Sequence, residues 1–228
     1  MERVRRSIRG FRAAALIGGL VAALAAPLDA TLGSSASVSP AHALVRLLEG
    51  NLRYVASFAR HPDQSEARRI EVANGQSPFA VILTCSDSRV APELLFDQGL
   101  GSLFVIRLAG HVADDACIGS IEYAVEHLGA SLVLVLGHEK CGAVKATLEG
   151  GHAPGRIGAI TEQIRPALDR TGHRGADPLD DAVCANVRLV VDRLRYAEPI
   201  LASRVKRGTV EVIGGRYDLD RGTVEIFH

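Results

Sequence analysis

The sequence predicts an α/β fold with a mostly parallel central β-sheet, flanked by helices and preceded by an N-terminal helical arm. Two observations lead to this fold class. Three short, almost continuously apolar runs lie at residues 79–85, 102–109 and 131–137, and segments with helical spacing lie between and after them. Strands that are apolar on both faces are typical of parallel sheets covered by helices. Strands that alternate with helices indicate a layered α/β domain.

The first expected element is a helix over residues 40–58. Ser39 is a favourable N-cap, and Pro40 suits the first helical position. Apolar side chains recur every three or four residues along this segment, at Leu44, Leu48, Leu52, Val55 and Phe58. This spacing predicts an apolar stripe along one side of the helix.

The remaining elements follow in chain order. The three apolar runs are expected to be buried strands, and helical spacing occurs at residues 116–129, 140–150, 155–170 and 179–197. Residues 208–227 hold two alternating segments, which predict a hairpin at the edge of the sheet. The sequence contains no internal repeat and no glycine-rich phosphate loop of the Walker or dinucleotide type.

The first 30 residues are typical of a signal peptide. The basic stretch "MERVRRSIRGFR" is followed by an apolar run, Ala13–Ala26, and then by small residues, which is the order of regions in a secretory signal. The pair Arg5 and Arg6 before a weakly apolar core resembles a twin-arginine signal. We therefore expect export to the periplasm or the extracellular space, with cleavage after Ala25 or Ala30. If the segment is only a basic extension, the protein is cytoplasmic.

Residues 31–39 are expected to be a linker, and residues 40–228 a single domain, because the chain is long enough for one sizeable core. Beyond residue 30 the chain has 21 basic and 24 acidic residues. This mildly acidic balance gives no electrostatic reason to expect nucleic-acid binding. The apolar run at 13–26 is too short to cross a bilayer comfortably, so we expect no stable membrane span.

Two predicted strands end in side chains that bind metal ions. Cys85 ends the first apolar run, while His138 and Cys141 follow the third in the sequence "GHEKCGAV". Ligand sites in α/β sheets gather beyond the carboxyl ends of the strands, so these side chains converge if the two strands are neighbours. Two thiolates and one imidazole with a fourth position left open indicate a catalytic zinc site. Cys117 and Cys184 fall on helical segments and are expected to be buried core thiols.

Asp87 and Arg89 lie within four residues of Cys85. Taken alone, Asp87 would be a helix cap and Arg89 a surface charge. Beside the predicted ligands, bidentate pairing with Arg89 would keep the Asp87 carboxylate ionised. Asp87 could then orient a hydroxide that zinc generates from water. We interpret the pair as an orienting dyad.

The sequences "CSDSRV" and "GHEKCG" resemble the two zinc motifs of the beta-class carbonic anhydrases, and the resemblance runs from about residue 40 to the end. It implies one catalytic domain at 40–228 with one Zn²⁺ per chain, bound by Cys85, His138 and Cys141. It also implies a catalytic dyad of Asp87 and Arg89.

The same resemblance implies a set of substrate-binding residues. One of them would hydrogen-bond bicarbonate, and the others would line the carbon dioxide pocket or follow the last ligand: Gln76 for the first role, then Phe104, Ala109, Tyr123 and Gly142. Family members are dimers or multiples of dimers, and pocket residues often come from the partner subunit. A homodimer or larger assembly is therefore expected, with the helix at 40–58 as an arm across the interface.

Two features depart from the usual pattern of the family. Leu108 and His111 stand near positions where many members have asparagine. We interpret His111 either as a neutral, hydrogen-bonded substitute or as a proton-handling group near the mouth of the site. The chain also has no tryptophan, a residue used by the remote bicarbonate site of members whose aspartate closes onto zinc. We therefore expect the open state, in which Asp87 pairs with Arg89.

The implied activity is zinc-dependent, reversible hydration of carbon dioxide to bicarbonate and a proton, by zinc-bound hydroxide that the Asp–Arg dyad orients. Two alternatives stay open. Carbonyl sulfide and carbon disulfide hydrolases resemble this family closely and share its motifs. A non-catalytic zinc-binding protein would need a filled coordination shell, and it would give the Asp87–Arg89 pair no purpose.

Overall fold

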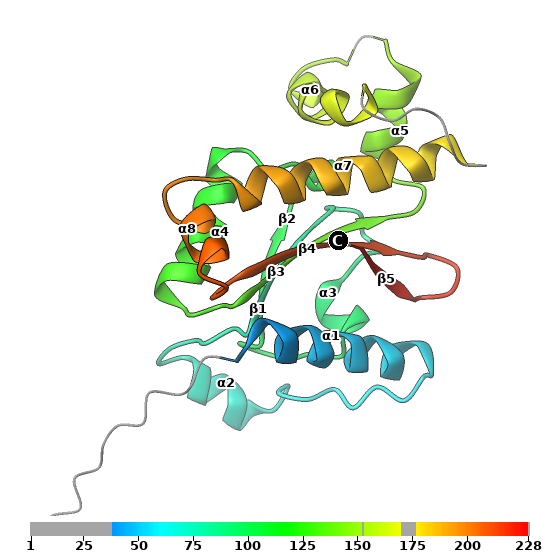
Figure 1. Cartoon of the computed structure of the whole chain (residues 1–228). Coiled ribbons are helices and arrows are strands. Elements are labelled where there is room, and N and C mark those ends of the chain that lie inside the picture. Colours follow the sequence, from blue (N-terminus) through cyan, green and yellow to red (C-terminus); the bar gives the residue numbers. More distant parts are fainter. Residues whose placement is uncertain (1–37, 152, 170–176, 228) are drawn as a thin grey trace, which may run out of the picture. The chain divides into compact units, whose positions relative to one another are not determined.

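The computed structural model describes residues 38–151, 153–169 and 177–227. The predicted signal peptide and residues 31–37 of the predicted linker lie outside these ranges. The described residues are built around a five-stranded sheet (Figure 1) with the strand order β2-β1-β3-β4-β5. The strands are β1 (Ala80–Thr84), β2 (Leu103–Arg107), β3 (Leu132–His138), β4 (Glu211–Tyr217) and β5 (Val224–Phe227).

The sheet is parallel except at one edge. β1 pairs in parallel with β2 and with β3, and β3 pairs in parallel with β4. β5 pairs with β4 in the antiparallel direction and forms the edge. The predicted mostly parallel sheet and its terminal hairpin are therefore confirmed.

Helices precede, connect and follow the strands. They are α1 (Pro40–Val55), α2 (Glu66–Val72), α3 (Pro92–Leu95), the 3₁₀ turn η1 (Ala109–His111), α4 (Asp115–His127), α5 (Gly142–Glu149), α6 (Ile157–Leu168), α7 (Pro178–Arg195) and α8 (Leu201–Lys206). Side chains cap several of the longer helices. Asp114 accepts a hydrogen bond from Cys117 N at 2.8 Å, and Asp177 accepts one from Leu179 N at 2.9 Å, so each helix begins where its free N–H groups find an acceptor.

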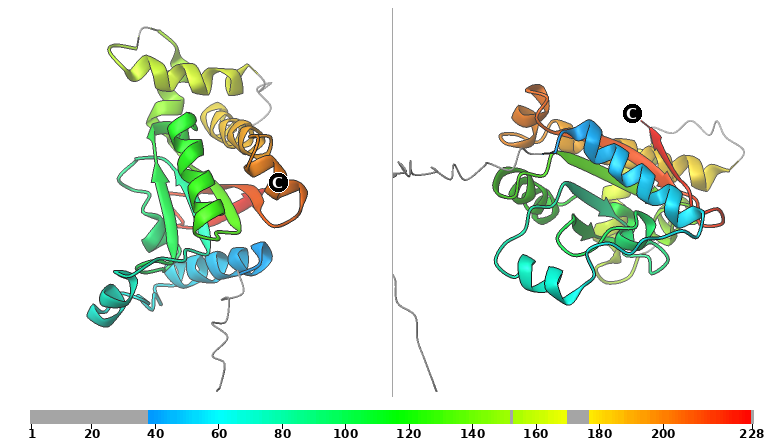
Figure 2. Two further views of the ribbon diagram at one scale, coloured as in Figure 1. Left: turned by 90° about the vertical axis from the view of Figure 1, so that its left-hand side faces the viewer. Right: turned by 90° about the horizontal axis from the view of Figure 1, so that it is seen from below.

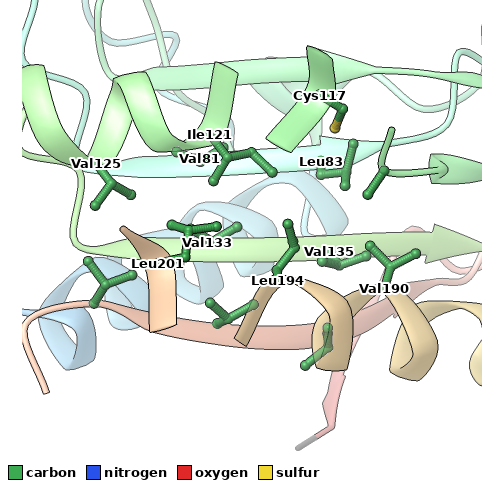
Figure 3. Packing of buried hydrophobic residues seen from close by; sticks show 14 of the residues in the cluster. Val81, Leu83, Cys117, Ile121, Val125, Val133, Val135, Val190, Leu194 and Leu201 are labelled. Atoms are coloured by element: carbon green, nitrogen blue, oxygen red, sulfur yellow. The ribbon is translucent and has the colours of Figure 1, made fainter. Parts of the chain in front are cut away.

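Both faces of the sheet are covered by helices (Figures 1 and 2). Val81 and Leu83 of β1 and the matching side chains of β3 pack with α4, α7 and α8, as Figure 3 shows. Their neighbours in the strand, Ala80 and Ile82, pack on the opposite face with α1 and α3. Strands that are apolar at every position are needed for this arrangement, because successive side chains point to opposite faces.

Two expected elements differ in their burial. β1 and β3 are buried at every position, as predicted, but β2 is only half-buried, because it lies at the edge of the sheet. The helix α1 ends at Val55 and buries Ala43 and Leu47 among others. The predicted apolar stripe is partly wrong, because some of its side chains face outward. Leu52, within the helix, is 69% exposed, and Phe58, which follows the helix, is 78% exposed.

No helix within the described ranges is both long and apolar enough to cross a membrane. α2, α3 and α8 were not predicted, and each is seven residues or shorter.

A buried carboxylate joins the end of α3 to the chain that follows α1. The Asp97 side chain is fully buried, pairs with Arg53 Nε at 2.6 Å, and accepts hydrogen bonds from Arg60 N at 3.0 Å and His61 N at 2.9 Å. Burial alone would raise the pKa of this carboxyl, but the donors outweigh it and hold the pKa below its usual value. Folding is thus linked to ionisation of Asp97.

We expect Asp97→Asn to lower the free energy of unfolding by about 2 kcal/mol near neutral pH, because charge-assisted hydrogen bonds are lost in a buried place. The pKa is lower in the folded state, so this stabilisation is present above the pKa of the unfolded chain and is lost as the pH falls through the folded value. Urea unfolding measures the free energy of unfolding of the wild type and of the variant. The difference between the two should be constant from about pH 5 to pH 8 and should shrink below about pH 4.

The matched control is Glu66→Gln, which removes an exposed carboxylate paired with Arg69. It should change the stability by less than about 1 kcal/mol. Equal effects of the two substitutions would contradict the role given to Asp97.

Candidate metal centre

Three side chains from two neighbouring strand ends meet at one point. Cys85 directly follows β1, His138 is the last residue of β3, and Cys141 is the N-cap of α5. The parallel register pairs Thr84 with Leu136, which brings the ends of β1 and β3 to the same edge of the sheet. The two sulfur atoms and one imidazole nitrogen all lie within 4.8 Å of one another, and all three residues are buried.

The tautomer of His138 suits metal binding. Its Nδ1 lies 2.7 Å from the carbonyl oxygen of Glu139, an acceptor, so Nδ1 carries the proton. Nε2 is buried and has no hydrogen-bond partner among the described residues. An unprotonated buried nitrogen without a partner is costly unless it binds something, and a metal ion would satisfy it.

The two cysteine thiols shift each other's pKa in opposite directions. The adjacent Cys141 thiol, more than any other group, lowers the pKa of Cys85 to about 3, with further help from His138 and the Gly110 N–H. The same contact, together with burial, raises the pKa of Cys141. A lowered pKa favours the thiolate form of Cys85, and thiolates are the form in which cysteines bind metal ions.

This donor set fits zinc. Two sulfur atoms and one imidazole are typical zinc ligands, and their spacing allows one ion to reach all three. The described residues supply three donors and no fourth, and three protein ligands with an open position are typical of catalytic zinc sites. A structural site would require a fourth protein ligand.

Asp87 and Arg89 form a bidentate pair beside these donors. Arg89 donates from Nε to Asp87 Oδ1 at 2.9 Å and from Nη2 to Oδ2 at 2.7 Å, and its backbone N–H also donates to Oδ1. These hydrogen bonds hold the pKa of Asp87 well below its usual range. Asp87 Oδ2 lies 3.9 Å from His138 Nε2, so an ionised carboxylate faces the place where the donors meet.

Two arginines that no sequence motif marks hold the chain around this site. Arg107, at the end of β2, donates to the carbonyl oxygens of Cys85 at 3.2 Å and Asp87 at 2.6 Å. Arg216 of β4 pairs with Glu139 at 2.5 Å, and the Glu139 carbonyl holds the His138 ring. The sequence offered one sign of these roles: Arg107 and Arg216 are charged residues within segments that were predicted to be strands.

The predicted substrate-binding residues have different surroundings. Gly142 directly follows the donor Cys141. Ala109 directly precedes Gly110, whose N–H donates a hydrogen bond to Cys85 Sγ. Gln76 is exposed in the loop before β1, Phe104 is half-buried on β2, and Tyr123 of α4 is 51% exposed.

His111 lies inside the fold and not at an open mouth. It is fully buried, and burial lowers the pKa of its ring to about 4. Its Nε2 lies 2.9 Å from the Asn186 side-chain amide. These observations favour the neutral, hydrogen-bonded alternative.

The other two cysteines are free thiols. Cys117 is buried between α4 and the sheet, as expected, and burial raises the pKa of its thiol to about 12. Cys184 was also expected in the core, but it is only half-buried, because α7 turns this position partly outward. Burial still raises the pKa of Cys184 to about 11, so both stay protonated near neutral pH.

Known proteins are similar to this chain in sequence and in fold. A carbonic anhydrase from Mycolicibacterium smegmatis is 42% identical over 192 residues, which cover 82% of this chain and 93% of the relative. Carbonic anhydrase 2 from Mycobacterium tuberculosis is 41% identical over 190 residues, or 82% of this chain and 92% of the relative.

Solved structures agree with the sequence comparison. The Coccomyxa beta-carbonic anhydrase in complex with acetazolamide superposes with a TM-score of 0.65 at 31% identity, covering 81% of this chain and 86% of that one. The beta-carbonic anhydrase CcaA gives a TM-score of 0.64 at 28% identity, covering 81% and 95%. The sequence profile of the family described as "Carbonic anhydrase" matches residues 80–224. With its Cys–His–Cys centre at the ends of β1 and β3, the chain belongs to the beta-class carbonic anhydrase family.

Proposed function

We propose that the chain binds one Zn²⁺ through Cys85, His138 and Cys141 and hydrates carbon dioxide reversibly to bicarbonate and a proton. One observation carries this proposal. The three donors lie within 4.8 Å of one another, and His138 Nε2 has no hydrogen-bond partner among the described residues. As is established for carbonic anhydrases, the bound ion would supply a Lewis acid that makes hydroxide available from water near neutral pH.

Asp87 would orient the attacking oxygen. Its carboxylate is ionised and fixed by two hydrogen bonds from the Arg89 side chain. Such a carboxylate can only accept, so it takes a hydrogen bond from the attacking water or hydroxide and directs that oxygen's lone pair toward the substrate. Arg107 keeps the backbone of Cys85 and Asp87 in place while this happens.

The pairing of Asp87 with Arg89 also supports an open resting state. Both carboxylate oxygens accept from the Arg89 side chain, so closure of Asp87 onto the ion would break charge-assisted hydrogen bonds. The absence of tryptophan from the sequence agrees with this state.

The substrate pocket would be completed in a dimer. Phe104, Ala109 and Tyr123 would line the apolar side for carbon dioxide, Gln76 would hydrogen-bond bicarbonate, and Gly142 would leave room beside Cys141. Exposure of Gln76 and Tyr123 in the single chain is consistent with sites that a partner subunit covers. Leu52 and Phe58 offer an apolar surface for that partner.

We further propose that the first 30 residues direct export, by the twin-arginine route. That route carries folded proteins, so zinc and reduced cysteine ligands could cross together. The support is the order of the basic and apolar regions in the sequence.

The proposed activity is tested by stopped-flow hydration of carbon dioxide with the full chain. Zinc-loaded protein should be active, removal of zinc with a chelator should abolish the activity, and re-addition should restore it, because the donors alone supply no Lewis acid. Hydrolysis of carbonyl sulfide, measured on the same preparation, should be much slower. An inactive zinc-loaded protein, or activity that survives zinc removal, would refute the proposal.

Asp87→Asn should lower kcat/KM about 100-fold, because losing the orientation of a reacting atom can cost about 10²-fold. Zinc content should stay at the wild-type level, since Asp87 is not among the proposed ligands. The pKa of Asp87 lies below its usual range, so the carboxylate is ionised at every pH above that range and the deficit should be the same from about pH 6 to pH 9.

The control is Asp115→Asn, an equal change of charge at an exposed position on α4. It should leave kcat/KM unchanged. An Asp87→Asn variant with full activity would show that the carboxylate does not orient the attacking oxygen.

The double variant Leu52→Asp, Phe58→Asp should be monomeric and less active, because charges replace the exposed apolar side chains proposed to contact the partner. Light scattering gives the mass, and the hydration assay gives the activity. His42→Asp, an exposed change near the start of α1, should keep both properties of the wild type. A fully active monomer would contradict the shared pocket.

A further inference from the structure

Asn186 lies on α7, a helix that supplies none of the three metal donors, and it is 1% exposed. Its side-chain Nδ2 lies 2.9 Å from the carbonyl oxygen of Gly110 and 2.9 Å from His111 Nε2. The Gly110 oxygen can only accept, so the amide nitrogen must face it. The second N–H of the amide then donates to His111 Nε2, and the neutral ring keeps its proton on Nδ1.

The opposite side of Gly110 faces a metal donor. The Gly110 N–H donates to Cys85 Sγ at 3.3 Å in a buried place. The residue thus receives a hydrogen bond on its carbonyl from Asn186 and gives one from its N–H to the sulfur. Asn186 and Cys85 are far apart in sequence but are joined through this single residue.

The backbone of this turn is unfavourable without support. Gly110 has φ 66° and His111 has φ 44°, and the latter region is costly for a residue with a side chain. A Cβ on Gly110 would lie 2.6 Å from Ile164 Cδ1 and 3.2 Å from Ala143 Cβ, so α6 and α5 leave no room for a side chain at this position. The hydrogen bond from Asn186 of α7 holds the carbonyl of the same residue whose N–H donates to the sulfur.

We infer that Asn186 is a positioning residue for the metal centre: it holds the Gly110 turn so that its N–H donates to Cys85 Sγ. This hydrogen bond stabilises the thiolate form and fixes the sulfur for the ion. Loss of the amide would leave the Gly110 oxygen and His111 Nε2 buried without a donor, and the turn would relax away from the sulfur. The inference rests on the zinc-dependent function proposed above.

The test uses Asn186→Leu, which keeps the side-chain size, and Asn186→Asp, which keeps the shape but replaces the donor by an acceptor. Zinc affinity is measured by competition with a chromophoric chelator, and both variants should bind about tenfold more weakly than the wild type. In the cobalt-substituted proteins, the sulfur-to-cobalt absorption band should shift to longer wavelength, because a sulfur without its hydrogen bond gives up an electron more easily.

The matched control is Val190→Ala, which removes buried contacts one turn further along α7. It should lower the unfolding midpoint but leave the zinc affinity and the cobalt band unchanged. If Val190→Ala weakens zinc binding as much as the Asn186 variants do, the effect is general loosening of α7 and the inference is wrong. Wild-type affinity and an unshifted band in the Asn186 variants would also overturn it.

A measurement on the wild type needs no variant to fold. In protein loaded with ¹¹³Cd, the Gly110 amide proton should show scalar coupling to the metal through Cys85 Sγ, and absence of this coupling would overturn the inference. Wild-type protein that binds no metal would refute the proposed function as well, whereas normal metal binding without the coupling refutes only the role of Asn186.

Discussion

The parallel pairing of β1 with β3 is the constraint on which the rest of the structure depends. It brings Cys85 and the His138–Cys141 turn to one edge of the sheet, although more than fifty residues separate them in the chain. Apolar side chains on both faces of these strands bury them between helices, which fixes the pairing. A shift of register would separate Cys85 from His138 and Cys141 and remove the centre.

Arginines from two other strands then hold the chain around Cys85, Asp87 and His138. Arg107 of β2 holds the carbonyl oxygens of Cys85 and Asp87, and Arg216 of β4 holds Glu139, whose carbonyl orients the His138 ring. The structure therefore separates two tasks. The strands set the distances between the donors, while long polar side chains hold the backbone that orients them. A centre whose donors are held in this way suits a reaction that needs an oriented nucleophile and no large movement of the chain.

Much of this organisation was predictable from local patterns. Buried strands, capped helices and the cysteine and histidine at strand ends are each visible within ten residues, so their prediction needed no knowledge of distant contacts. Arg107, Asn186 and Arg216 were missed, because their roles exist only through partners far along the chain. The outward side chains of Leu52 and Phe58 and the half-buried Cys184 were missed for a related reason. Spacing shows which residues share a side of a helix but not which side the core occupies.

The central claim is that two sulfur atoms and one imidazole hold a zinc ion that keeps one position for solvent. X-ray absorption spectroscopy of the purified protein at neutral pH measures this coordination directly. The account predicts two sulfur ligands at about 2.3 Å, one nitrogen at about 2.0 Å and one oxygen. A third sulfur or a second nitrogen in place of the oxygen would contradict it, and so would a protein that holds no zinc.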